Sequence, residues 1–240
     1  IWATETFDIT TIRASTGQYL ISKYISENTD YKVVLSGDGS DEVASGYIYN
    51  YLAPSPEELH LEAVKRVKEI HLYDGLRADR ATSIHGLELR VPFLESNFVD
   101  MYLSIDPKYR IPTEDRMEKY LLRKSFEGYL PEDVLWRKKE AFSDGISSEE
   151  DSWHSIINSF VDKLVSDEEF NNNSLKYTHC TPKTKEAYFY RKIFDELFDD
   201  KYSNVIPDFW MPNWSNAEDP SARELKKLYN SSDTEVSVSI

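Results

Sequence analysis

A short glycine-rich segment carrying three acids is the part of this 240-residue sequence whose residue types and spacing most directly suggest chemistry. Residues 36–42 are Ser-Gly-Asp-Gly-Ser-Asp-Glu. Glycines let the backbone approach a ligand closely, and a helix that starts just after them offers unpaired N–H groups to an anion. The three acids would repel phosphate unless a divalent cation intervened, and Mg²⁺ prefers carboxylate together with phosphate oxygen. The spacing predicts a phosphate site with Mg²⁺, although a helix-capping turn with Ser40 as N-cap explains it equally well.

A run of three cations, Arg-Lys-Lys at residues 137–139, is the second candidate for chemistry. It lies between Trp136 and Phe142, and Ser-Asp-Gly at residues 143–145 marks a tight turn. Solvated surface is the default for lysine and arginine. The aromatic neighbours and the turn give modest support to an anion site here, and the solvated surface stays open as the alternative.

A third charged segment, residues 86–94, contains Glu88 and Arg90. Gly86 and Pro92 bracket it, and the apolar residues 91, 93 and 94 predict that the loop is held inside the protein. Buried charges need partners, so Glu88 and Arg90 are expected to have them.

The elements that position these segments alternate between helix and strand. Thr10 and Thr11 can cap a helix over about residues 12–26, and the β-branched run at 31–35 predicts a buried parallel strand. A helix over about 40–51 would follow the glycine-rich loop. This order is typical of a doubly wound α/β sheet, which binds ligands at the carboxyl ends of its strands. After Pro54 the pattern is mostly helical, with a long helix capped at Ser55 and others near 96–103, 118–129, 152–166 and 184–197.

The composition limits the classes of partner. With 40% hydrophobic residues the chain can bury a core, and one domain is expected. A net charge of −15 argues against a general nucleic-acid or anionic-membrane partner. The single cysteine, Cys180, permits no internal disulfide and suits the cytoplasm. No apolar run approaches the roughly 20 residues that span a bilayer.

Six segments, taken together and in order, resemble glutamine-dependent asparagine synthetase: residues 10–15, 33–42, 46–49, 87–94, 139–145 and 181–188. The resemblance covers about residues 4–198, and residues 210–223 are similar to the tail of eukaryotic-type members. It implies a doubly wound parallel sheet of the ATP pyrophosphatase type, incomplete at its N-terminal side and followed by a mostly helical part. We expect a synthetase domain over residues 1–206 and a partly disordered C-terminal extension over 207–240.

The resemblance also implies an activity. Members bind ATP, Mg²⁺ and aspartate, form β-aspartyl-AMP with release of pyrophosphate, and let ammonia displace AMP to give asparagine. A glutaminase domain of the same polypeptide supplies the ammonia, and a homodimer remains open. Neither that domain nor the family's Ser-Gly-Gly-x-Asp-Ser loop is in this sequence, so residues 1–240 alone are not expected to turn over.

Five residues match the centre of the family's site. The resemblance implies that Ser36 and Gly37 contact the adenosine monophosphate part of ATP and that Asp41 binds Mg²⁺. Asp38 stands where the family commonly has Glu, at a catalytic position needed around adenylate formation and ammonia attack. Lys139 matches the catalytic lysine that meets pyrophosphate.

Four further residues match the surroundings of that site. Thr11 and Arg13 match positions lining the aspartate and adenylate pocket, while Glu88 and Arg90 match a supporting loop. Two alternatives remain open: a relative that forms another acyl-adenylate, such as a β-lactam-forming synthetase, and a non-catalytic remnant. The Gly-Asp-Gly-Ser-Asp loop favours the asparagine-forming pattern.

Overall fold

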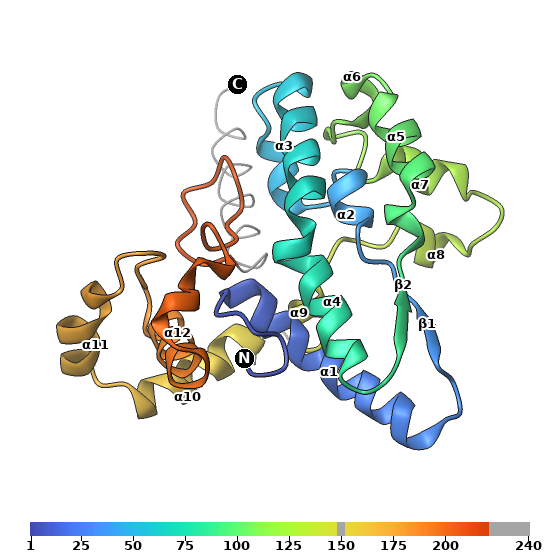
Figure 1. Ribbon diagram of the computed structural model, residues 1–240. Coiled ribbons are helices and arrows are strands. Elements are labelled where there is room, and N and C mark those ends of the chain that lie inside the picture. Colours follow the sequence, from blue (N-terminus) through green and yellow to red (C-terminus); the bar gives the residue numbers. More distant parts are fainter. Residues whose placement is uncertain (148–151, 221–240) are drawn as a thin grey trace. The chain divides into compact units, whose positions relative to one another are not determined.

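The computed structural model describes residues 1–147 and 152–220, which form a mixed α/β structure that is mostly helical (Figure 1). The chain divides into two compact units. The first consists of Ile1–Val34, His71–Leu89 and Phe142–Trp210, and the second consists of Leu35–Ile70, Arg90–Ala141 and Met211–Ile240.

The helices of the first unit are α1 (Ile9–Asn28), α4 (Asp74–Ser83), α9 (Phe142–Gly145), α10 (Trp153–Leu164), α11 (Asp167–Asn173) and α12 (Lys185–Phe198), with 3-10 helices η4 (Ser174–Lys176) and η5 (Asp200–Val205). Those of the second unit are α2 (Ser40–Val43), α3 (Pro56–Glu69), α5 (Ser96–Ser104), α6 (Pro107–Arg110), α7 (Tyr120–Ser125) and α8 (Glu132–Leu135), with η1 (Ile48–Leu52) and η3 (Pro92–Leu94). The 3-10 helix η2 (Ile70–Leu72) links α3 to α4. The helices expected near residues 96–103, 118–129, 152–166 and 184–197 are confirmed as α5, α7, α10 and α12.

Two strands, β1 (Val33–Leu35) and β2 (Glu88–Arg90), lie side by side (Figure 1). The Glu88 N–H donates to the Lys32 carbonyl at 2.7 Å and the Ser36 N–H to the Arg90 carbonyl at 2.9 Å, so the pairing advances in the same direction along both strands. The predicted parallel strand is confirmed, but its predicted burial is wrong. Val33 is 43% and Leu35 72% exposed, because β1 pairs only with β2 among the described residues and nothing covers these side chains.

The loop around Glu88 and Arg90 also differs from its prediction. Both side chains are exposed and only the intervening Leu89 is partly buried. Because successive side chains of a strand point to opposite faces, Glu88 and Arg90 share the outward face of β2. The predicted burial of Glu88 and Arg90 is therefore wrong, whereas the apolar part of the loop is held inside as expected: Leu87 is buried, and residues 91, 93 and 94 are partly buried.

Helix α1 of the first unit starts earlier than Thr10 and Thr11 suggested. Its N-cap is Asp8, whose carboxylate accepts hydrogen bonds from the backbone N–H and the hydroxyl of Thr11 at 2.8 and 2.7 Å. The same carboxylate accepts the Trp210 N–H at 2.8 Å. Aspartate is among the strongest N-caps, and here it also ties the start of α1 to residue 210.

Helices α1 and α12 are joined by a buried ion pair. The guanidinium of Arg13 donates to both carboxylate oxygens of Glu186 at 2.9 and 2.5 Å, and these side chains are 4% and 1% exposed. Nearby, the rings of Phe7 and Phe194 meet edge-on with their centroids 5.1 Å apart. A second cluster, Val161, Val165 and Tyr188, packs α10 against α12.

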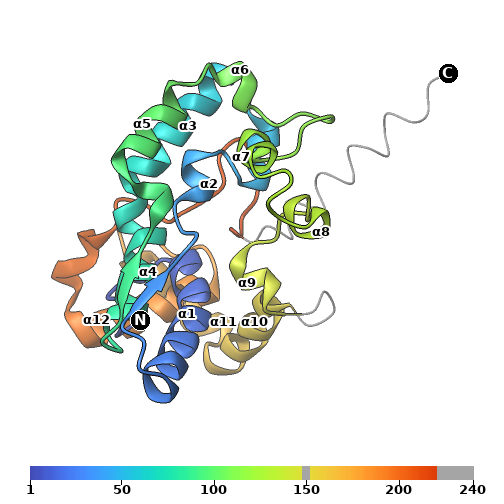
Figure 2. The ribbon, with the colours of Figure 1, turned by 90° about the vertical axis from the view of Figure 1, so that its right-hand side faces the viewer.

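The second unit is built around α2, which packs against both α3 and α5; Figure 2 labels all three helices. Val43, Ala44 and Tyr102 form the centre of its core. The cap predicted for α3 is confirmed, since Ser55 Oγ accepts the Glu58 N–H at 3.2 Å. The helix predicted over residues 40–51 is wrong: α2 ends at Val43, because Ser45 takes a left-handed conformation (φ 52°) that an α-helix cannot continue.

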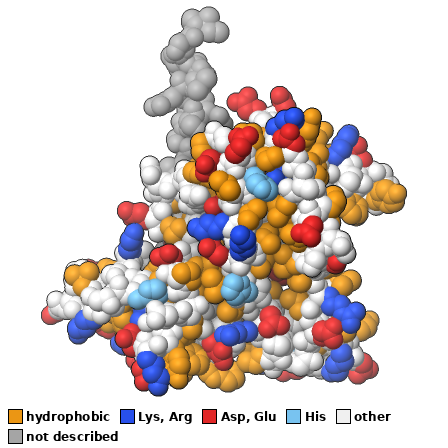
Figure 3. Space-filling model, turned by 45° about the horizontal axis from the view of Figure 1, so that its top comes forward, with side chains coloured by type: hydrophobic (Ala, Val, Ile, Leu, Met, Phe, Trp, Pro, Cys, Tyr) orange, Lys and Arg blue, Asp and Glu red, His pale blue; other side chains and the backbone are white. Residues whose placement is uncertain are grey.

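Charges are spread over the surface that Figure 3 shows, where acidic and basic side chains are interspersed with apolar ones. None of the helices in the described ranges is long and apolar enough to cross a membrane. The domain boundary after residue 206 stays a prediction. Of the C-terminal extension expected over residues 207–240, residues 221–240 lie outside the described residues.

We predict that Glu186→Ala lowers the free energy of unfolding by about 3–5 kcal/mol, because it leaves the Arg13 guanidinium buried without its carboxylate. Urea denaturation measures this change. The control is Glu196→Ala, which removes an exposed acid from the same helix and should stay within about 0.5 kcal/mol. Replacing both partners, as Arg13→Met with Glu186→Leu, should recover much of the loss. If Glu186→Ala and Glu196→Ala lowered the free energy of unfolding by equal amounts, the buried ion pair would not have the stabilising role given to it here.

Candidate functional site

One carboxylate in the second unit is shared by two lysines. Lys119 Nζ lies 2.8 Å from Asp41 Oδ1, and Lys139 Nζ lies 2.8 Å from Asp41 Oδ2. The side chains of Asp41, Lys119 and Lys139 are 21%, 18% and 16% exposed. The site is therefore largely enclosed yet open to a ligand on one side.

The glycine-rich loop delivers Asp41 to this position. Gly39 is the N-cap of α2 and has φ 89°, a conformation that side chains rarely adopt. A Cβ at Gly39 would also overlap the side chain of Leu94. The turn at Gly39 starts α2 abruptly and places Asp41 in its first turn.

Gly46 leaves the space in which Asp41 and Lys119 meet. Its N–H donates to the Asp41 carbonyl at 2.8 Å. A Cβ at Gly46 would overlap Asp41 Oδ1 and would lie 2.9 Å from Cδ and Cε of Lys119. Only glycine fits here without moving the ion pair.

Lys119 is held by its neighbour Glu118. Lys119 has φ 58°, a left-handed backbone that costs a non-glycine residue about 1–2 kcal/mol. Glu118 is 4% exposed; its carboxylate accepts Arg123 Nη2 at 2.7 Å and the Tyr51 hydroxyl at 3.0 Å. Arg123 Nε also donates to the Glu118 carbonyl at 3.0 Å. These bonds on both sides of the turn fix the strained residue.

The two lysines determine the charge of Asp41. Burial by itself would raise the pKa of the Asp41 carboxyl, but the ammonium groups of Lys139 and Lys119 outweigh it and hold that pKa well below its usual range. Asp41 is therefore ionised at neutral pH. With two cations and one anion, the triad carries one net positive charge.

Ser36, Gly37 and Asp38 precede this triad on the same loop. Ser36 Oγ donates to Asp38 Oδ2, and the Asp38 N–H returns a bond to Ser36 Oγ at 3.3 Å. Apart from Gly37 and its two chain neighbours, no atom of the described residues lies within 4 Å of the place where a Cβ of Gly37 would stand. The backbone at Gly37 is thus open to close approach by a ligand.

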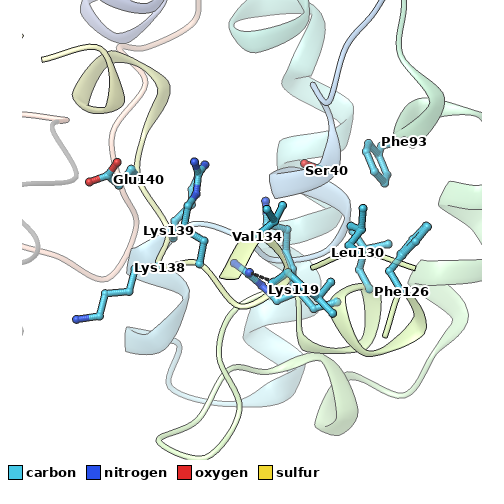
Figure 4. Close-up of a pocket in the computed structure, with 13 residues that line it drawn as sticks. Ser40, Phe93, Lys119, Phe126, Leu130, Val134, Lys138, Lys139 and Glu140 are labelled. Atoms are coloured by element: carbon cyan, nitrogen blue, oxygen red, sulfur yellow. Dashed lines mark hydrogen bonds between the residues drawn. The ribbon is translucent and has the colours of Figure 1, made fainter. Parts of the chain in front are cut away.

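A cavity of about 450 Å³ adjoins the two lysines. Its polar lining is largely cationic, and its apolar lining comes mainly from α7, α8 and the loop between them. Figure 4 shows Phe93, Phe126 and Leu130 on one side and Lys138 and Glu140 on the other. The lining residues are Ser40, Phe93, Lys119, Leu122, Arg123, Phe126, Leu130, Val134, Leu135, Arg137, Lys138, Lys139 and Glu140.

The predicted site residues fall into both units. In the second unit, Asp41 meets Lys139, and Ser36 meets Asp38, while Arg90 is exposed. In the first unit, Thr11 and Arg13 are buried and bonded to Asp8 and Glu186 respectively, and Glu88 is exposed. Through these contacts Thr11 and Arg13 stabilise the fold of the first unit. The substrate-binding roles of the two residues remain predictions.

Two residues of the site were not predicted. Lys119 and Arg123 stand in a run whose charges look like an ordinary exposed helix, and no local pattern marks the left-handed turn before α7. The cysteine, in contrast, behaves as expected. Burial raises the pKa of Cys180 to about 11, so its thiol stays protonated although His179 Nε2 lies 3.4 Å away.

The donor set does not by itself fit a magnesium ion. In residues 1–147 and 152–220, no group of three His, Cys, Asp or Glu side chains could hold a metal. Both oxygens of Asp41, the predicted ligand, are on lysine ammonium groups. A metal could reach this carboxylate only after a lysine moved.

Fold and site together define a mostly helical α/β protein with a charged site just after a parallel strand. The model of the asparagine synthase family matches residues 1–57 and 51–222. Asparagine synthetase [glutamine-hydrolyzing] of Mus musculus is 53% identical over 227 residues, that of Gallus gallus 52% over 228, and that of Homo sapiens 51% over 227. Each alignment covers 94% of this chain and 40% of the relative.

The chain belongs to the asparagine synthase family, as its motifs predicted. It spans 40% of the length of the curated relatives it matches. The names of these relatives are those of glutamine-hydrolysing enzymes.

We predict that Gly46→Ala lowers the free energy of unfolding by about 1–3 kcal/mol, the usual cost of overpacking a filled site. The new methyl group has to displace either the Asp41 carboxylate or the Lys119 stem. Gly37→Ala is the matched control, because its methyl group meets no atom within 4 Å and should cost less than about 0.5 kcal/mol. Urea titration of both variants measures their free energies of unfolding. If the two unfolding transitions coincided, the ion pair of Asp41 and Lys119 would tolerate the methyl group.

Proposed function

We propose that this chain provides the ATP-dependent, amide-forming site of a glutamine-hydrolysing asparagine synthetase. A β-carboxylate oxygen of aspartate attacks the α-phosphorus of ATP, forming β-aspartyl-AMP and expelling pyrophosphate. Ammonia then attacks the acyl carbon, loses a proton, and expels AMP to leave asparagine.

The contact between Asp41 and Lys139 is the observation that carries this proposal. It joins two of the family-like segments, residues 36–42 and 139–145, across 98 positions of the sequence. The segments supply an open backbone at Gly37, a carboxylate at Asp38 and a cation at Lys139 within one unit. These are the groups that adenylation and release of an anionic leaving group need.

Each residue has a proposed role. The Lys139 ammonium neutralises the departing pyrophosphate, and the Gly37 backbone with Ser36 contacts the adenosine monophosphate part of ATP. Asp38 acts on the reacting groups, where its charge stabilises the ammonium that develops as ammonia attacks. Asp41 orients Lys139, and Mg²⁺ remains a prediction for the ATP-bound state, in which phosphate oxygens would supply its other ligands.

The surroundings of the site complete the proposal. Thr11 and Arg13 line the aspartate and adenylate pocket, and Glu88 and Arg90 belong to the supporting loop. The exposed β1 strand takes its place in a wider, doubly wound sheet of the ATP pyrophosphatase type, inside a synthetase domain that ends near residue 206. A glutaminase domain of the same polypeptide delivers ammonia, and a homodimer is compatible with these features.

The test of the function is the stoichiometry of the full-length protein. With ATP, Mg²⁺, aspartate and ammonia we expect asparagine, AMP and pyrophosphate in equal amounts. Lys139→Ala should slow adenylation by an amount that corresponds to about 3–4 kcal/mol, the typical cost of removing a preorganised donor for developing charge. It should change aspartate binding far less. Pyrophosphate exchange into ATP measures the adenylation step separately.

Lys124→Ala is the control for Lys139→Ala, because it removes an exposed cation that pairs with Glu127 outside the cavity lining. Its adenylation rate should stay close to that of the parent. Formation of ADP and phosphate in place of AMP and pyrophosphate would refute the proposed reaction. Parental adenylation by Lys139→Ala would refute only the role of that lysine.

For Asp38 the full-length protein should distinguish reach from charge. Glutamate is longer than aspartate by about 1.5 Å, one carbon–carbon bond, and Gly37 and Gly39 let the loop adjust to it. We therefore expect Asp38→Glu to stay within about tenfold of the parent and Asp38→Asn, isosteric but uncharged, to lose much more. The measurement is ammonia-dependent asparagine formation, followed separately from adenylate formation. Near-parental rates in Asp38→Asn would reduce Asp38 to a loop-forming residue.

A further inference from the structure

The two lysines at Asp41 provide more positive charge than the carboxylate needs. One ammonium is enough to neutralise one carboxylate, and a second one brings two like charges close together. Each ammonium has three N–H donors, and in the described part of the chain Asp41 is the acid that either lysine pairs with. Up to two donors on each lysine therefore remain for a ligand.

The backbone at Lys119 is held in a conformation that the fold must support. Its left-handed φ of 58° is unfavourable for lysine, whereas Asn or Gly would adopt it easily. The buried Glu118 and its partners Arg123 and Tyr51 hold the turn in place. Supported strain of this kind gathers at ligand sites, and here it brings the Lys119 ammonium to the cavity.

The cavity supplies the place for an anion between the lysines. Lys119, Lys139 and Ser40 line the same cavity of about 450 Å³, and Arg137 and Lys138 add two further cations to its wall. Glu140 is the single acid among the lining residues. An anion with several charges and many acceptor oxygens matches this lining better than a carboxylate does, since each lysine offers more than one donor.

We infer that Lys119 is a second pyrophosphate-contacting residue and an equal partner of Lys139, and that Asp41 holds the two ammonium groups apart so that both reach the same polyphosphate without a metal ion. The inference rests on the proposed function, because the ligand is the pyrophosphate part of its ATP. It goes further in assigning Lys119 and in giving Asp41 an orienting role of its own.

The test is calorimetric titration of the full-length protein with inorganic pyrophosphate in excess EDTA. The parent should bind, and Lys119→Asn should weaken binding by at least about tenfold, because a hydrogen bond between charged groups contributes about that much. Lys139→Asn should weaken it by a similar factor. Asn at residue 119 suits the left-handed backbone and Lys139 still pairs with Asp41, so Lys119→Asn should remain folded, which a cooperative thermal transition checks.

Two further variants sharpen the result. Lys119→Arg keeps the charge and should bind within about threefold of the parent. Lys124→Asn removes an exposed lysine of α7 that pairs with Glu127 outside the cavity lining, and should leave binding unchanged. Parental affinity in Lys119→Asn, or no binding by the parent in EDTA, would overturn the inference. If asparagine, AMP and pyrophosphate still form, either result leaves the proposed function standing. If that reaction fails while pyrophosphate binding still depends on Lys119, the proposed function alone is overturned.

Discussion

The shared carboxylate of Asp41 is the interaction on which the site depends. A carboxylate that is largely removed from water loses hydration, and the loss has to be offset by nearby cations or by protonation. Two lysines from different segments provide this compensation, and the pKa of Asp41 is held low as a result. The left-handed turns at Gly39 and Lys119 bring Asp41 and Lys119 together. The absence of a side chain at Gly46 leaves the space in which they meet.

Buried acids elsewhere in the structure are also paired with cations. The chain has 43 acids and 28 lysines and arginines, and several of the cations are placed against buried acids. Arg13 pairs with Glu186 in the first unit, and Arg66 in the second donates to Glu62 at 2.6 Å and to the Met211 carbonyl at 2.6 Å. Arg66 thereby ties the segment after residue 210 to α3. Because these arginines neutralise buried acids, much of the excess negative charge is carried by acids at the surface.

The sequence was most informative where local chemistry decides the outcome. Ser55 caps its helix as predicted, because a cap depends on three or four adjacent residues. It was least informative where distant partners decide. The exposure of Val33 and Leu35 depends on which strands lie beside β1, and the role of Lys119 depends on an acid far away in the sequence. The break after Val43 goes with the left-handed backbone of Ser45, which helical periodicity does not register.

The proposed polyanion site lies in a chain of net charge −15, so its local positive charge has to outweigh the charge of the whole chain. At physiological ionic strength, charges separated by more than about 8 Å in solvent are largely screened. The acids dispersed over the surface therefore contribute little at the cavity, whereas Lys119 and Lys139 stand at its wall, in a partly enclosed space where screening is weaker. The local excess of one positive charge outweighs the global deficit. An acidic protein can thus hold phosphate, provided that a carboxylate such as Asp41 keeps its cations organised before the ligand arrives.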